Sequence, residues 1–313
     1  MRIGFFLLLI ISLVDAKEIK PSYIFKASGY VNDFFVSKDK IYLASDVGIV
    51  DIYDLKTKKI INQIVLTPLI TGEGNVIDSV ISSVDVWNEK VLITSTTTSG
   101  YKNVWLYENY TLRLIVDESK KLTVKEARFI DKEKVIFNTL GADVILHDID
   151  ESYSVYRTHI VDSRIGDYQL SNDKKTMAIA DESGAVSIIN VEDSKILKQP
   201  EPQNLDNIFH IAYSNGVVLT AGQDRRVGVY PKHAKPYYLK QNFLVYCVGL
   251  SPSAQVGVYT KGEENILQIF NPSTKKNLYE GVGHKGIVNQ IKFISEREFY
   301  SSDRSINVYF WKF

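Results

Sequence analysis

The sequence is poor in the residues on which redox and disulfide chemistry depend. Among 313 residues there is one cysteine, Cys247, and there are only three tryptophans. A single cysteine excludes an internal disulfide framework and a Cys-x-x-Cys-His haem attachment motif. Because Cys247 lies in an apolar segment, we expect a buried and unreactive thiol. We therefore expect neither a redox centre nor a bound cofactor.

The sequence also lacks an excess of either charge. Lysine and arginine together number 37, as do aspartate and glutamate, and the formal net charge is zero. Nucleic-acid-binding proteins usually carry a basic patch or stripe, and this sequence has no long basic run. The five histidines lack a metal-binding spacing such as His-Glu-x-x-His, and there is neither a phosphate-binding loop nor a nucleophile elbow. These absences favour a protein that is non-catalytic and does not bind nucleic acid.

Only one long apolar run is present, at residues 3–14, preceded by Arg2 and followed by small residues up to Ala16. It is shorter than the roughly 20 residues that a membrane-spanning helix needs, so we expect no stable membrane span. This order of features is typical of a secretory signal peptide. We predict cleavage after Ala16, with an uncleaved anchor as the alternative, and a single domain at residues 17–313. An exported chain with one cysteine suits the bacterial periplasm.

The sequence does contain a repeated strand pattern. The segment VNQIKF near the C-terminus follows the pattern apolar-x-x-apolar-x-apolar, which recurs six times upstream. The seven copies begin at Val31, Ile81, Val124, Ile165, Ile208, Val245 and Val288. Successive starts are separated by 50, 43, 41, 43, 37 and 43 residues. These intervals are close to the roughly 40 to 50 residues of one propeller blade.

Each interval also contains further short segments rich in β-branched and aromatic residues. In the first interval they read KIYLAS, IVDIYDL and KIINQIVL, and no interval shows a sustained helical period. We predict an all-β fold, a seven-bladed β-propeller of four-stranded antiparallel blades. The last repeat has only three strands, and an open edge beside the first blade favours aggregation. We predict that the segment SYIFKA, residues 22–27, completes the last blade and closes the ring.

The last repeat resembles a WD repeat, the blade unit of many propellers. The matching residues are Gly283, His284, Ser301, Asp303 and Tyr309, where the family usually has tryptophan at the last position. The resemblance implies a hydrogen-bonded network inside one blade, so we assign these side chains a structural role. In the fifth repeat, Asp224 and Tyr230 match the turn aspartate and the aromatic position, and no Gly-His pair occurs in repeats one to six.

The first strand of each blade lines the central channel of a propeller, which makes its side chains candidates for binding. The third positions of the seven aligned strands are Asp33, Ser83, Glu126, Asp167, His210, Cys247 and Gln290. Because the repeats are equivalent, we expect these residues to form a ring at one height. Three carboxylates and an imidazole in such a ring suit a hard cation or a basic segment of a partner, and the alternative is a solvated polar channel.

Two loops are further candidates for contact with a partner. Arg225 and Arg226 lie in a predicted hairpin turn, where they suit an anionic partner, although a solvated turn is the simpler interpretation. Residues 94–103, TSTTTSGYKN, form a predicted extended hairpin that protrudes from blade two or remains a passive loop.

The overall character of the chain suggests a function. An exported, monomeric propeller with degenerate WD-type repeats and no cofactor motif is similar to the NapL accessory proteins of the periplasmic nitrate reductase system. This resemblance implies a non-catalytic interaction scaffold that supports nitrate respiration. The alternatives are a metal-dependent hydrolase of the lactonase type and an assembly factor for outer-membrane proteins, since one fold hosts many functions.

Overall fold

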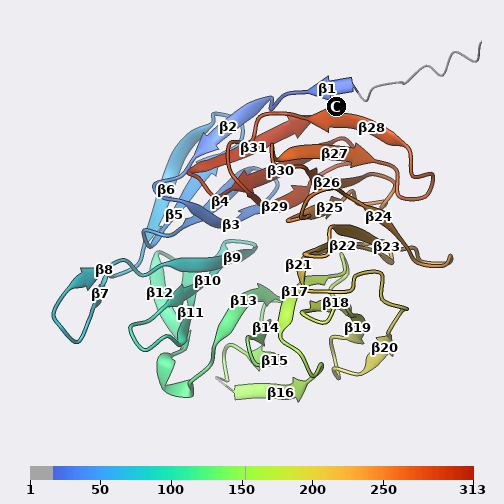
Figure 1. The fold of residues 1–313 in the computed structure, drawn as a ribbon. Coiled ribbons are helices and arrows are strands. Elements are labelled where there is room, and N and C mark those ends of the chain that lie inside the picture. The colour runs from blue at the N-terminus through green and yellow to red at the C-terminus, as the bar shows by residue number, and fades with distance from the viewer. Residues whose placement is uncertain (1–16, 152) are drawn as a thin grey trace, which may run out of the picture.

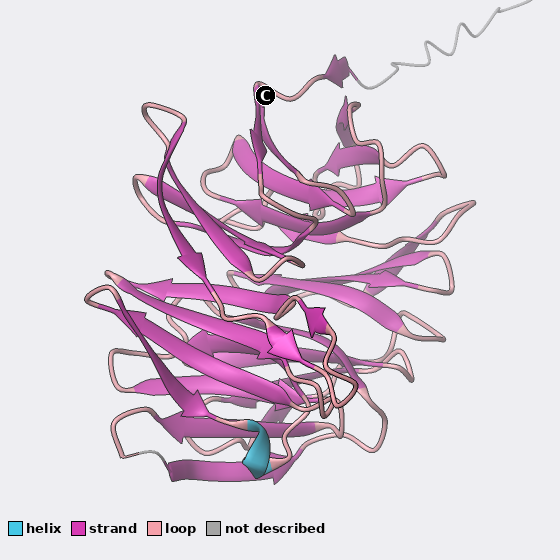
Figure 2. Ribbon diagram, turned by 90° about the vertical axis from the view of Figure 1, so that its left-hand side faces the viewer, coloured by secondary structure: helices cyan, strands magenta, loops and turns pink. Residues whose placement is uncertain are grey.

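In the computed structural model, which describes residues 17–151 and 153–313, seven antiparallel four-stranded blades surround a central axis, and one of them gains a fifth, parallel strand (Figure 1). This arrangement confirms the predicted seven-bladed β-propeller. The predicted signal peptide, residues 1–16, lies outside the described residues. Almost every regular element is a strand, and Figure 2 shows one short 3-10 turn, η1 (Glu118–Lys120). The described residues contain no helix with the length and apolar character needed to cross a membrane.

The blades follow one another along the chain, each with its first strand at the channel. Blade one contains β3 (Val31–Val36), β4 (Lys40–Ser45), β5 (Ile49–Asp54) and β6 (Lys59–Val65), and blade two contains β9 (Ile81–Trp87), β10 (Lys90–Thr96), β11 (Lys102–Glu108) and β12 (Thr111–Val116). Blade three contains β13 (Val124–Phe129), β14 (Lys134–Thr139), β15 (Asp143–Asp148) and β16 (Tyr153–His159). Blade four contains β17 (Ile165–Leu170), β18 (Thr176–Asp181), β19 (Val186–Asn190) and β20 (Ile196–Lys198). Blade five contains β21 (Ile208–Ser214), β22 (Val217–Gly222), β23 (Arg226–Tyr230) and β24 (Tyr237–Lys240). Blade six contains β25 (Val248–Leu250), β26 (Gly257–Lys261), β27 (Ile266–Phe270) and β28 (Asn277–Gly281).

The hydrophobic core is divided among the contacts between neighbouring blades. Seven apolar clusters are present, one at each of the seven interfaces between adjacent blades. In the cluster between blades two and three, for example, Leu106 packs with Phe129 and Phe137. Both faces of each middle strand are therefore buried, which explains why these strands are nearly continuous apolar runs. The stability of each blade depends on its two neighbours, and the ring must close.

The N-terminal segment closes the ring as predicted. The seventh blade contains β29 (Val288–Phe293), β30 (Glu298–Asp303) and β31 (Asn307–Lys312), and β2 (Tyr23–Lys26) pairs antiparallel with β31 as its fourth strand. Phe25 of β2 is buried at the interface of blades seven and one.

A second N-terminal strand was not predicted. Strand β1 (Lys17–Ile19) pairs parallel with β28 and adds a fifth strand to blade six. Pro21 then connects β1 to β2 and packs against Gly283, where a Cβ atom would lie only 3.0 Å from the proline ring. The glycine of the Gly-His pair thus leaves room for the segment that joins blades six and seven.

One hairpin projects from the ring between blades one and two (Figure 1). It consists of β7 (Leu69–Ile70) and β8 (Val76–Ile77), which pair only with each other. The predicted hairpin at residues 94–103 forms within blade two, and its tip is held by a hydrogen bond from Ser99 to Glu118 of 2.6 Å. Sequence reasoning missed the β7–β8 hairpin, although the 50-residue interval that contains it is the longest of the six.

Deletion of residues 17–27 tests the closure of the ring. Loss of β1 and β2 exposes the Phe25 cluster and the edge of β31, so we expect the melting temperature to fall by on the order of 10 °C. Differential scanning calorimetry measures the change, and deletion of residues 17–20 alone, which keeps β2, is the matched control with a smaller expected effect. An unchanged melting curve for the longer deletion would contradict the closure by β2.

Candidate functional site

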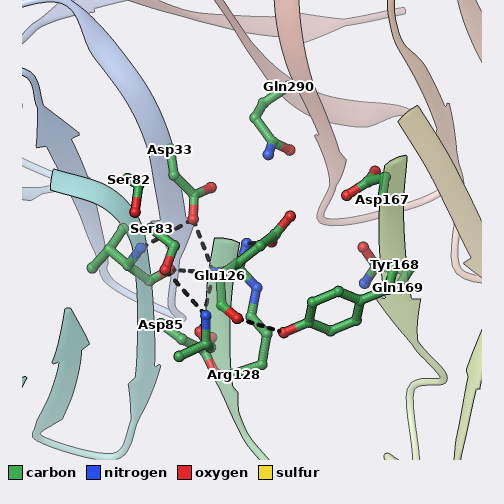
Figure 3. A network of polar contacts seen from close by, with 12 residues as sticks. Asp33, Ser82, Ser83, Asp85, Glu126, Arg128, Asp167, Tyr168, Gln169 and Gln290 are labelled. Carbon is green, nitrogen blue, oxygen red and sulfur yellow. Dashed lines mark hydrogen bonds and ion pairs between the residues drawn. The ribbon is translucent and has the colours of Figure 1, made fainter. Parts of the chain in front are cut away.

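The central channel brings four of the predicted ring residues together. A cavity of about 400 Å³ at one mouth and one of about 250 Å³ toward the other mouth share the side chains of Glu126, Asp167, His210 and Gln290. The larger cavity begins at the second residue of the inner strands, and the smaller one extends past the fifth residue. These four residues therefore form the waist of the channel, accessible from both sides, and Figure 3 shows Glu126, Asp167 and Gln290 around the open centre.

The other ring residues lie in the wall. Asp33 reaches the edge of the larger cavity, while Ser83 is buried with its hydroxyl against the next blade. Cys247 is fully buried in the apolar cluster between blades six and seven, and burial raises the pKa of its thiol well above the ordinary value. Strand β25 begins only at Val248 because the Thr260 hydroxyl accepts hydrogen bonds from the backbone N–H groups of residues 246 and 247.

A β-bulge in the inner strands turns the third side chain toward the next blade. The register shifts between the first and third positions in six blades, for example between Val31 and Asp33. Asp33 Oδ2 then accepts a hydrogen bond of 3.0 Å from the N–H of Val84 in blade two. Ser83 and Asp167 accept equivalent bonds from the N–H groups of the following blades, at 3.2 and 2.9 Å. The ring residues thus join neighbouring blades as well as lining the channel.

Asp33 is the most highly connected of them. Its buried carboxylate lies 2.9 Å from Arg128 Nη1 of blade three and 2.8 Å from Lys292 Nζ of blade seven. Burial acts to raise the pKa of Asp33, but the charges of Arg128 and Lys292 outweigh it and hold the pKa below its ordinary value. One carboxylate therefore connects blade one to three other blades. Figure 3 shows its contact with Arg128.

The cations that contact Asp33 come from a second ring that sequence reasoning missed. The fifth positions of the aligned strands are Phe35, Asp85, Arg128, Gln169, Ala212, Gly249 and Lys292. Arg128 also donates to Glu126 Oε2 at 2.6 Å, and Asp85 accepts a hydrogen bond of 2.7 Å from the N–H of Phe129. Burial raises the pKa of Asp85. The alignment of the inner strands that predicted the third-position ring also contains these fifth-position residues, two residues further along each strand.

The waist itself combines acidic and neutral groups. His210 Nε2 lies 3.4 Å from Gln290 Oε1 and 3.8 Å from Asp167 Oδ2. Burial lowers the pKa of His210 to about 4, so its imidazole is neutral at physiological pH. Burial, opposed by Arg128, raises the pKa of Glu126 to about 7. Within residues 17–151 and 153–313, no group of three His, Cys, Asp or Glu side chains is arranged to hold a metal ion.

The two arginines predicted as loop contacts differ in their surroundings. Arg226 lies 3.5 Å from Asp224, donates to the carbonyl of Gln203 at 3.1 Å and packs over the ring of Tyr238. Arg225 is exposed, with a φ angle of +65° in the turn. The side chain of Arg226 is therefore held by contacts within its own blade, whereas Arg225 lies exposed in the turn.

The blade-seven network forms around His284 and includes Trp311, which sequence reasoning missed. His284 Nδ1 lies 3.0 Å from Asp303 Oδ2, and its Nε2 lies 2.7 Å from Ser301 Oγ. The indole N–H of Trp311, not a group of Tyr309, donates to Ser301 Oγ at 2.7 Å. Tyr309 is directly opposite Ser301 in the register and packs its ring against His284, whereas Trp311, two residues further on the same face, reaches back to the hydroxyl.

Blade five contains a similar network built from other side chains. Asn204 precedes its inner strand by four residues, as His284 does in blade seven. Thr220 donates to Asn204 Oδ1 at 2.6 Å, and Asn204 Nδ2 donates to Asp224 Oδ1 at 3.0 Å. The predicted match of Asp224 to the signature therefore reflects a hydrogen-bonded network in which asparagine replaces histidine.

Replacement of Asp33 by asparagine tests the importance of its contacts. The substitution removes the countercharge of Arg128 and Lys292 in a buried setting, so we expect a loss of about 3 to 5 kcal/mol in the free energy of unfolding. Urea denaturation measures this loss, and Asp46→Asn, at a more exposed carboxylate of the same blade, is the control. Equal stabilities of Asp33→Asn and the control would contradict the structural role of Asp33.

The buried imidazole of His210 predicts a dependence of stability on pH. Its folded-state pKa of about 4 lies below the unfolded value of about 6.5, so between these values the unfolded chain binds more protons and stability falls as the pH falls. From pH 7 to 5 we expect His210 to contribute a loss of about 2 kcal/mol. Urea denaturation at both pH values should show a smaller loss for His210→Gln than for wild type or for His233→Gln, an exposed control. Identical losses in all three proteins would refute this assignment.

Comparison with known proteins does not identify a family for this chain. No protein-family model matches the chain, and no significant match to a curated protein is found. Its WD-like character therefore rests on the seven blades and on the network around His284.

Proposed function

We propose that this chain is a non-catalytic protein-interaction scaffold, exported to the periplasm, that supports the periplasmic nitrate reductase system. The observation that carries the scaffold function is the β7–β8 hairpin, which we call the apolar arm. Its side chains Ile70, Val76 and Ile77 are 71%, 70% and 44% exposed. Exposed apolar surface of this kind marks sites of protein contact.

The apolar arm is shaped by hydrogen bonds rather than by packing against the ring. The N–H of Thr71 donates to the carbonyl of Asn75 at 2.9 Å across the turn, and the Ser79 hydroxyl donates to the carbonyl of Thr67 at 2.6 Å at the base. A two-stranded hairpin is at best marginally stable alone in water. Insertion of the β-branched side chains of the arm into a hydrophobic groove of a partner would stabilise both its conformation and the complex.

The outer strand of blade one extends this surface toward the ring. Strand β6 leads directly into the arm and exposes Ile60, Ile61 and Val65. As an edge strand, β6 also has backbone groups available for pairing, in contrast to β28, whose outer edge is covered by β1. The arm and β6 together suit a protein partner with an apolar, extended surface.

The nitrate reductase assignment is supported by the sequence resemblance. It rests on the N-terminal apolar run, the degenerate repeats and the lack of cofactor motifs in the sequence. A scaffold of this kind acts through contacts, so its contribution would be the assembly of the reductase or the organisation of its electron-transfer partners.

Crosslinking in cells that respire nitrate tests both parts of the proposal. We expect mass spectrometry to identify components of the periplasmic nitrate reductase with the wild-type chain. Because the apolar contacts are lost, we expect the double variant Ile70→Ser, Val76→Ser to capture at least fivefold less. Glu73→Gln, in the turn of the same arm, is the matched control and should capture as much as wild type.

The outcomes separate the two parts. Equal capture by the double variant would overturn the role of the arm. Capture of outer-membrane-protein assembly components instead, together with normal nitrate reduction in a deletion strain, would overturn the nitrate reductase assignment.

A further inference from the structure

The geometry of the channel points to a binding site that is separate from the apolar arm. We propose that the waist binds a primary ammonium group carried on a short aliphatic chain, with the ammonium between Glu126 and Asp167. The aliphatic chain would extend into the larger cavity, which has a volume of about 400 Å³.

The first observation is that Asp167 is a buried carboxylate without a cationic partner. It is 6% exposed, and its Oδ2 accepts the hydrogen bond from the N–H of Ile211. Among the described residues, its one ion-pair neighbour is His210, at 3.8 Å, which is charged only when protonated. By contrast, Asp33 has two cations within 3 Å. A buried carboxylate favours a paired charge, and here an ammonium ion from outside would supply it.

The second observation is independent of the carboxylates and concerns His210. Its side chain lines the cavities on both sides of the waist and is 8% exposed. Nε2 faces Gln290 and Asp167, and Nδ1 has no hydrogen-bond partner within the described chain. A neutral imidazole adds polarity to the waist without supplying the missing positive charge.

One wall of the larger cavity, which is otherwise lined by polar side chains, suits the aliphatic chain of such a ligand. Phe209 lines this cavity and stacks on Tyr246 with ring centroids 5.7 Å apart, which gives an apolar wall for methylene groups. At the waist, the carboxylates of Glu126 and Asp167 and the amide oxygen of Gln290 offer acceptors for the three ammonium hydrogens. A hard metal ion prefers six or more oxygen ligands, and this set is smaller.

Binding should be linked to the protonation of Glu126. The groups that face it are Arg128, Asp167, Lys125, Asp33, Tyr168 and His210, and burial raises its pKa to about 7. An ammonium ion stabilises the ionised carboxylate, so binding below this pKa releases a proton. The affinity should therefore rise by up to about tenfold from pH 6 to pH 8, a range in which an alkylamine stays protonated.

Isothermal titration calorimetry of the full chain with n-butylammonium chloride tests the site. We expect saturable binding that is tighter at pH 8 than at pH 6 and at least tenfold weaker in Asp167→Asn. Asparagine can still accept the hydrogen bond from Ile211, so a melting curve near that of wild type would show that this variant is folded. Glu126→Gln should bind more weakly and lose the pH dependence, and Glu73→Gln, far from the channel in the turn of the arm, should bind as wild type does.

Further titrations distinguish the source of the ammonium group and the outcomes that oppose the site. Tighter binding of acetyl-Gly-Lys-Gly-amide than of n-butylammonium would support a lysine side chain of a partner as the natural ligand, and the reverse would support a free amine. Lack of binding by both probes would overturn the proposal. So would unchanged binding in folded Asp167→Asn, or equal affinity for potassium chloride or n-butanol. The apolar arm does not enter these measurements, so their outcome is independent of the scaffold function.

Discussion

The contacts of Asp33 show the constraint on which this structure depends, the closure of seven similar blades into one ring. Its carboxylate joins blade one to the backbone of blade two, to Arg128 of blade three and to Lys292 of blade seven. Residues 33 and 292 are distant in sequence and meet because blade seven, whose fourth strand is β2, packs beside blade one. A buried carboxylate with one partner is costly, whereas two cations and a backbone N–H offset its desolvation. Closure and the polar wall of the channel thus depend on each other.

The third residue of the inner strand has different roles in different blades. Where the third side chain of the inner strand accepts a hydrogen bond from the next blade, as with Ser83, it stabilises the contact between blades. At the waist, Glu126, Asp167, His210 and Gln290 also border the cavities. The repeats provide equivalent backbone positions, and divergence of the side chains at these positions makes the channel asymmetric. Binding chemistry can therefore be concentrated on one side of the axis while the remaining blades maintain the ring.

The network around His284 shows which contacts a sequence signature predicts and which it does not. The signature correctly placed His284, Ser301 and Asp303 in one blade, because these residues are close in sequence and joined by short hairpins. It assigned the aromatic position to Tyr309, whereas the indole of Trp311 reaches Ser301. Alternation along a strand places both aromatic side chains on one face, so only the register and the length of the side chain decide which of them reaches the hydroxyl.

The sequence predicted the number of blades, their phase and the closing strand, because these depend on local alternation and on regular spacing along the chain. It also predicted that Glu126, Asp167, His210 and Gln290 meet in the channel, since equivalent repeats place equivalent positions together, whereas Cys247 and Ser83 of the same predicted ring lie in the wall. Three features became apparent only in three dimensions: Arg128 and Lys292 meet on Asp33, Asp167 has no cationic partner among the described residues, and the hairpin at residues 69–77 projects from the ring. These features depend on distances across the channel and on exposure at the rim, and neither follows from the order of residues within a single repeat.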